Sequence, residues 1–234
     1  SAFMAGLGFG AYLWGQSIDK SSRPLLIYAK IEIALAVLCI PISSLIEKLG
    51  PTYASISVLV ENIFLPTELV KGFLAFTLMF FPAILMGATL PIISKYYVKH
   101  DSQLGSQVGL LYAFNTLGAA IGCALTGFIL ISALGVLQTT WFAAGINLLV
   151  GIGAIRVFQE TETEMDWSLP WPALPKWERN DEGKIWLAIS FICGFTALAY
   201  EVLWTRLLVF SIASTIYSFS MMLIVFLLGI MIGS

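Results

Sequence analysis

The feature that most constrains this chain is a succession of apolar stretches, most of them about 20 residues long or longer, separated by short polar breaks. The hydrocarbon core of a bilayer is about 30 Å thick, so a helix that crosses it needs roughly 20 apolar residues. Of all residues, 59% are hydrophobic and only 11% are charged. The pattern predicts an all-α fold, a polytopic bundle of transmembrane helices with the lipid bilayer as its main partner.

We expect about seven spans. The first ends near Trp14, and the second is expected over 25–46. Charges and prolines interrupt the next segment, so 50–67 is expected to form a short interfacial or re-entrant helix. A tight turn at Gly135 separates two of the remaining five spans, which are expected at 69–97, 108–134, 138–157, 184–210 and 214–234. The first and last spans have no polar flank at the chain ends, so we expect both to be incomplete.

Composition divides the chain into three parts. Residues 1–157 form a first group of helices, 158–183 an acidic linker rich in proline and tryptophan, and 184–234 the start of a second group. Cytoplasmic loops carry an excess of Lys and Arg. All but three of the 12 basic residues fall on one side of the alternating spans, the exceptions being Lys48, Lys71 and Arg206. The linker is therefore expected in the cytoplasm.

Residues suited to catalysis or metal binding are scarce. The three cysteines and the single histidine lack the spacing of a metal site or a catalytic triad, so we expect no catalytic residue, no metal and no cofactor. A net charge of −2 leaves no large basic surface, so nucleic acid is not an expected partner.

Polar side chains within the spans are the candidates for binding a substrate or an ion, because such groups usually face a bundle interior or a cavity. Glu201, about 25 Å into its span, is the first candidate, as a cation or proton site; a structural pair with Arg206 or with another helix is the alternative. Glu32 is expected in an interfacial salt bridge, with a substrate site as the alternative. Asn115 and Asn147 are expected to form hydrogen bonds between helices.

Glycines four residues apart are typical of close helix packing. We expect this role for three pairs: Gly6 with Gly10, Gly118 with Gly122, and Gly229 with Gly233. Phe3 and the first pair match Phe226 and the last pair at the same spacing, which indicates an internal repeat. If the sixth span has a counterpart ahead of the first, each repeat holds six spans in parallel orientation, the plan of major facilitator transporters.

A hinge is expected at the inner end of the first span. Gly15, Asp19, Lys20 and Arg23 resemble the loop between the second and third helices of the major facilitator superfamily. Glycine permits close approach of a neighbouring helix, and Asp19 can cap a helix end and pair with a basic group. The alternative is a polar loop with a turn glycine.

Several segments resemble the membrane region fused to spermidine synthases. They include Gly87-Ala88-Thr89-Leu90-Pro91, Gly109-Leu110-Leu111-Tyr112-Ala113-Phe114-Asn115 and Ala199-Tyr200-Glu201-Val202-Leu203-Trp204-Thr205-Arg206. The resemblance implies a facilitator-like membrane module, often fused to a cytoplasmic aminopropyltransferase domain. We expect it in a bacterial inner membrane.

Three functions remain open at this point. The first is a transporter-like domain that binds or moves a small cationic solute, with Glu201 lining the path. The second is a non-catalytic accessory subunit that packs against other membrane subunits or the rest of its own chain. The third is a membrane anchor for an aminopropyltransferase domain outside this sequence. The sequence lacks the strand and glycine-rich turn that such a domain needs, so we expect no enzyme activity from these residues.

Overall fold

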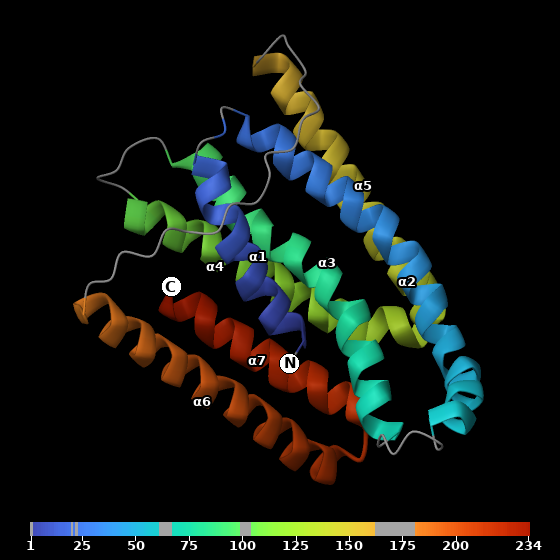
Figure 1. Ribbon diagram of the computed structural model, residues 1–234. Coiled ribbons are helices and arrows are strands. Elements are labelled where there is room, and N and C mark those ends of the chain that lie inside the picture. Colours follow the sequence, from blue (N-terminus) through green and yellow to red (C-terminus); the bar gives the residue numbers. More distant parts are fainter. Residues whose placement is uncertain (1, 20, 22, 61–66, 99–103, 162–180) are drawn as a thin grey trace. The chain divides into compact units, whose positions relative to one another are not determined.

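The computed structural model describes residues 2–19, 21, 23–60, 67–98, 104–161 and 181–234 (Figure 1). Every element in these ranges is a helix. Five helices are long and apolar enough to cross a membrane, and they lie at Pro24–Leu45, Gly72–Tyr97, Gly105–Gln159, Leu187–Ile212 and Thr215–Gly233. The all-α prediction is confirmed, and the apolar helices are consistent with an integral membrane protein.

The number of separate spans differs from the expected seven in two places. Within the described residues, α1 (Ala2–Asp19) is not among the five candidate crossings. The spans predicted at 108–134 and 138–157 lie in one apolar segment of 55 residues. Inside this segment the backbone leaves the helical region at Gly135, with φ 78° and ψ 170°. The predicted interruption at Gly135 is confirmed.

Helix α2 (Pro24–Val60) is longer than predicted. The predicted span 25–46 agrees with the candidate crossing Pro24–Leu45, but the separate short helix predicted at 50–67 is wrong, because α2 continues to Val60. Charged residues end an apolar stretch without ending a helix, whose backbone hydrogen bonds are internal. The apolar part of α2 does end at Leu45. Residues 61–66 of the predicted short helix lie outside the described residues.

The remaining helices follow the predicted order. Helix α3 (Thr67–Tyr97) contains Pro82 and Pro91. Helix α4 (Leu104–Leu125) passes into the π-helix η3 (Thr126–Leu130), which the sequence analysis did not predict, and then into α5 (Ile131–Thr161). Helices α6 (Asp181–Ile212) and α7 (Thr215–Gly233) complete the chain. Thus α5 and α6 extend into the ends of the predicted 158–183 linker, whose residues 162–180 lie outside the described part.

The contacts divide the chain into two compact units. Unit 1 comprises Ser1–Leu104 and Leu137–Pro175, and unit 2 comprises Gly105–Val136 and Lys176–Ser234. The division within α5 therefore falls next to Gly135. The grouping expected from composition kept residues 1–157 together, whereas the contacts group α4 and η3 with α6 and α7.

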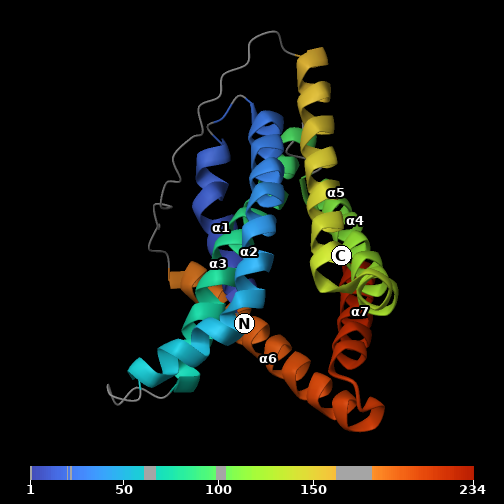
Figure 2. The same cartoon turned by 90° about the vertical axis from the view of Figure 1, so that its right-hand side faces the viewer.

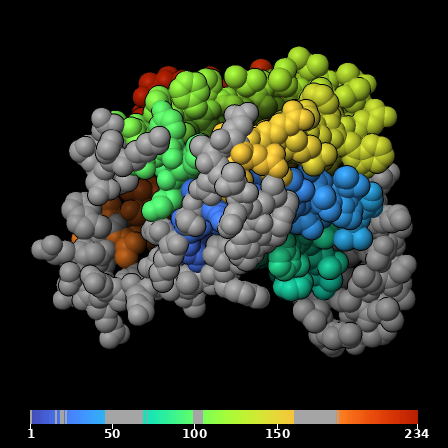
Figure 3. All heavy atoms as spheres, turned by 90° about the horizontal axis from the view of Figure 1, so that it is seen from above, coloured from blue at the N-terminus to red at the C-terminus, as the bar shows by residue number. Residues whose placement is uncertain are grey.

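Unit 1 has an apolar core with two clusters. One joins α1, α2 and α3, which lie against one another in Figures 1 and 2, and comprises Trp14, Ile18, Ile27, Ile31, Leu35, Ala88 and Ile92. The other joins α2 to α5, and comprises Leu25, Leu26, Ala29, Ala154 and Phe158. In Figure 3 the yellow residues of α5 lie beside the blue residues of α2.

Unit 2 is built around the α6–α7 hairpin, which turns at Ala213 with φ 57°. The residues that α7 buries are Ser218, Ser220 and Met222. Helix α7 also contacts η3, and the rings of Phe128 and Tyr217 stack there with centroids 5.5 Å apart. The apolar stretch of α6 buries no residue at all.

Candidate functional site

The strongest candidate site is a buried carboxyl in α2. Glu32 is 8% exposed and lies two turns after Pro24, about 12 Å into a candidate span at 1.5 Å per residue. The hydroxyl of Tyr28, one turn earlier on the same face, donates a hydrogen bond to the Glu32 carboxylate. Burying a charged group among apolar side chains is costly unless it is partnered. Glu32 is therefore enclosed by protein, which differs from the interfacial salt bridge expected from the sequence.

Tyr28 connects this carboxyl to the whole of unit 1. Its ring packs against the cluster that joins α1, α2 and α3 and also against the cluster that joins α2 to α5. The Tyr28–Glu32 pair thus lies where the four helical segments of unit 1 meet.

Gly151 of α5 lies directly against this part of α2. A Cβ added to Gly151 would lie 2.8 Å from Cγ1 of Ile33, 3.0 Å from the carbonyl oxygen of Ala29 and 3.4 Å from Cβ of Glu32. A residue without a side chain lets two helix backbones approach this closely. Because Gly151 has no side chain, α5 packs directly against α2 and covers this side of the site.

Asn147 shares this face of α5. It is half-buried and lies one turn before Gly151. Helices α2 and α5 run antiparallel along this contact, since the end of α5 clusters with the beginning of α2. The structure therefore brings two sequence candidates, Glu32 and Asn147, onto facing sides of neighbouring helices.

Glu201 is the candidate carboxyl of unit 2. Its Oε2 atom is enclosed and has no hydrogen-bond partner among the described residues. The Thr205 hydroxyl donates to the backbone carbonyl of Glu201, at 2.8 Å, and not to its carboxylate. Both residues belong to the half-buried stripe of α6, an otherwise exposed helix that contacts α7. An enclosed carboxyl oxygen without a donor is suited to accepting a proton or a cation.

Arg206 and Asn115 lie outside these two sites. Arg206 is exposed and lies five positions after Glu201 in α6. This spacing places the two side chains on different sides of the helix. The geometry of α6 therefore does not favour the pair with Arg206 that was considered as an alternative for Glu201. Asn115 is exposed on α4, whereas the next residue, Thr116, is buried.

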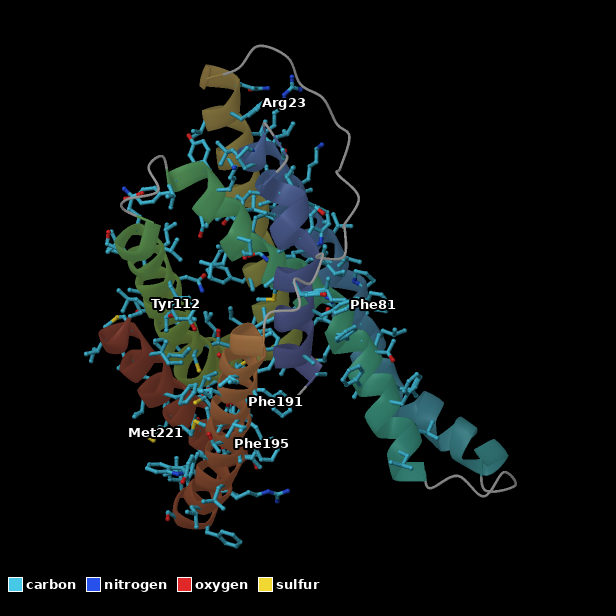
Figure 4. The ribbon with its side chains drawn as sticks, turned by 60° about the vertical axis from the view of Figure 1, so that its left-hand side comes forward. Arg23, Phe81, Tyr112, Phe191, Phe195 and Met221 are labelled. Carbon is cyan, nitrogen blue, oxygen red and sulfur yellow. The ribbon has the colours of Figure 1, made fainter. Side chains whose placement is uncertain are left out.

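The residues of the predicted hinge lie at the connection between α1 and α2. Gly15 is half-buried in α1, and a Cβ added there would meet nothing within 4 Å. The amide of Arg23, labelled in Figure 4, donates to the Ser21 hydroxyl at 3.2 Å. Asp19 is the last residue of α1, but its side chain and all of Lys20 lie outside the described part.

Two of the predicted packing glycines lie at a tight contact between α1 and α3. A Cβ at Gly6 would collide with Cβ of Ala83, and one at Gly10 would collide with the backbone carbonyl of Ile84. Gly87 of α3 is fitted against the α1 backbone in the same way. Small residues on both helices therefore bring the α1 and α3 backbones into contact.

The other four predicted packing glycines lie on open faces. A Cβ added at Gly118, Gly122, Gly229 or Gly233 would meet nothing within 4 Å. The structure does not bring them into a contact between described helices.

Metal ligands do not gather in the described part of the chain. It holds no group of three or more His, Cys, Asp and Glu residues able to bind a metal ion.

Comparison with known proteins does not indicate a function, because no family model, curated protein or solved structure matches this chain. The geometry around Glu32 and Glu201 is thus the main guide to function.

The sequence analysis missed Tyr28 and Gly151. Tyr28 could have been found, because it precedes Glu32 by one helical turn and carries a donor for a carboxylate. Gly151 could not, because Gly145 and Gly153 lie in the same apolar stretch. Only the contact with α2 distinguishes Gly151 from them, since a Cβ at either of the others would meet nothing within 4 Å.

Proposed function

We propose that this chain is a transporter-like membrane module that binds and moves a small cationic solute. The observation that carries the proposal is the burial of Glu32, 8% exposed, where the helices of unit 1 meet. Ionisable side chains within spans are costly and usually mark a substrate or ion pathway. Glu201, whose Oε2 has no hydrogen-bond partner among the described residues, is the corresponding carboxyl of unit 2.

The resemblance to the membrane region fused to spermidine synthases supports a facilitator-like architecture and a polyamine-like solute. In this proposal the apolar segment Gly105–Gln159 crosses the bilayer twice, turning at Gly135, and α1 supplies a further span. With these two additional spans the five candidate crossings become seven spans. This number fits one facilitator-like repeat together with the spans that flank it. The location would be a bacterial inner membrane, with residues 158–183 in the cytoplasm.

Uptake into liposomes tests the proposal. The purified chain is reconstituted, and entry of radiolabelled spermidine and of a second small cation, tetramethylammonium, is measured with and without a membrane potential. We expect saturable uptake of at least one cation that Glu32→Gln lowers about tenfold or more, equivalent to about 1.4 kcal/mol. Glu201→Gln is expected to lower uptake as well.

Gly8→Ala is the matched control, because a Cβ at Gly8 meets nothing within 4 Å. It should leave uptake unchanged. Uptake that is the same in the Glu32→Gln and Glu201→Gln variants as in the original chain would contradict the proposal, as would a complete absence of uptake in correctly folded protein.

A second function, a non-catalytic accessory subunit, is favoured by the exposed face of unit 2. The apolar stretch of α6 buries no residue, and Phe191 and Phe195 on one side of it are 74% and 66% exposed (Figure 4). Gly122 and Gly229 also face open space, as expected for surfaces that receive another helix. Copurification of a fixed set of membrane proteins, with no thermal stabilisation by any tested cation, would favour this function over transport.

A further inference from the structure

The surroundings of Glu32 restrict what this carboxyl can bind. Helix α5 packs closely against α2 next to Glu32, because a Cβ added at Gly151 would lie only 2.8 Å from Cγ1 of Ile33 and 3.0 Å from the carbonyl oxygen of Ala29. An organic ammonium ion is much larger than a methyl group. An organic cation held between α2 and α5 at this level would therefore require the two helices to separate.

The described part of the chain also gathers no set of metal-ligating side chains around Glu32 that would favour a hard metal cation. Ca²⁺ takes six to eight oxygen ligands, and Mg²⁺ takes six. The polar oxygen that the structure places on the Glu32 carboxylate is the Tyr28 hydroxyl, and no group of three acidic or thiol side chains occurs among the described residues. A proton needs neither space nor further ligands.

Few other ionisable side chains face the Glu32 carboxyl. On α2, Tyr28 faces the carboxyl, while Lys30 lies two residues away and thus on another side of the helix. The facing stripe of α5 presents Asn147 and Gly151, which do not titrate. The described residues that α1 and α3 contribute to the neighbouring cluster are Trp14, Ile18, Ala88 and Ile92.

We propose that Glu32 is a proton-binding site, so that the proton is the coupling ion of the cation transport proposed above. The step is simple addition of a proton to a carboxylate oxygen, with no other bond formed or broken. In the charged form the Tyr28 hydroxyl donates to the carboxylate. In the neutral form Tyr28 donates to the carbonyl oxygen, and the carboxyl becomes cheap to bury in apolar surroundings. The role of the proton as coupling ion rests on the proposed function, whereas proton binding by Glu32 can be measured without transport.

Infrared difference spectroscopy between acidic and alkaline pH tests the inference on the full chain in lipid. We expect a protonated-carboxyl band that Glu32→Gln removes and that Gly8→Ala, a control whose added Cβ meets nothing within 4 Å, leaves in place. Tyr28→Phe should shift the frequency of that band, because the carbonyl loses its donor. The shift also provides a readout if the Glu32→Gln variant fails to fold.

The two proposals fail in different ways. Cation uptake that does not respond to a pH gradient, in a protein whose difference spectrum is unchanged by Glu32→Gln, would overturn proton binding and leave transport standing. A band that depends on Glu32 in a protein that moves no cation supports proton binding and overturns transport. A Tyr28→Phe spectrum identical to that of the original chain would contradict the hydrogen bond between Tyr28 and Glu32.

Discussion

The two units differ in what they enclose, although both are built from apolar helices. In an apolar 18-residue window of the α2 span Pro24–Leu45, 44% of the residues are buried, and the buried residues of this span include large apolar side chains and Glu32. In the corresponding 18-residue window of α7 only 17% are buried, and two of the three residues that α7 buries are serines. Apolar composition places a helix in lipid but does not tell which helices enclose one another. Contacts between small residues and backbones decide that.

Two phenylalanines give the largest expected difference between the units. Phe158 is 4% exposed in the core of unit 1, whereas Phe191 is 74% exposed on α6. Phe158→Ala should cost about 3 kcal/mol through the cavity that it leaves, and Phe191→Ala less than about 0.5 kcal/mol. Thermal unfolding in detergent measures both. Equal losses would mean that the packing of unit 1 does not set its stability.

The glycine contact between α1 and α3 gives a smaller effect. Gly10→Ala should destabilise unit 1 by about 2 kcal/mol, because the new Cβ collides with the Ile84 carbonyl and the helices must separate. Gly8→Ala, with nothing within 4 Å of its Cβ, should be neutral or stabilising by up to about 1 kcal/mol. The comparison of the two melting temperatures checks this. A Gly10→Ala protein that melts no earlier than Gly8→Ala would rule out the close contact.

The break in α5 gives the smallest expected effect. Gly135 has φ 78° and ψ 170°, a region that side chains rarely adopt, so Gly135→Ala should cost about 1–2 kcal/mol. Gly145→Ala is the control, since a Cβ there meets nothing within 4 Å. Hydrogen exchange of the amides around residue 135 should speed up in Gly135→Ala alone. Similar exchange in both variants would show that the break does not require glycine.

Helix type and the position of the break at Gly135 were predictable, because apolar stretches of this length have few alternatives and a glycine followed by renewed apolar sequence marks a turn. The end of α2 was not predictable from the charges at Glu47 and Lys48, which limit contact with lipid but not helical hydrogen bonding. The burial of Glu32 was also missed. An acidic residue two turns into a span fits either an interface or an interior, and only the approach of Gly151 decides between them.

The order of segments in the two units has a consequence for how the protein is made. Unit 1 is interrupted by Gly105–Val136, which belongs to unit 2. During synthesis Glu32 therefore leaves the ribosome well over 100 residues before Gly151 can cover it, a delay of roughly 6–24 s at 5–20 residues per second. Throughout that interval the carboxyl has Tyr28 from its own helix but lacks α5. Nascent chains that end before residue 137 should consequently be the ones that membrane quality-control proteases recognise.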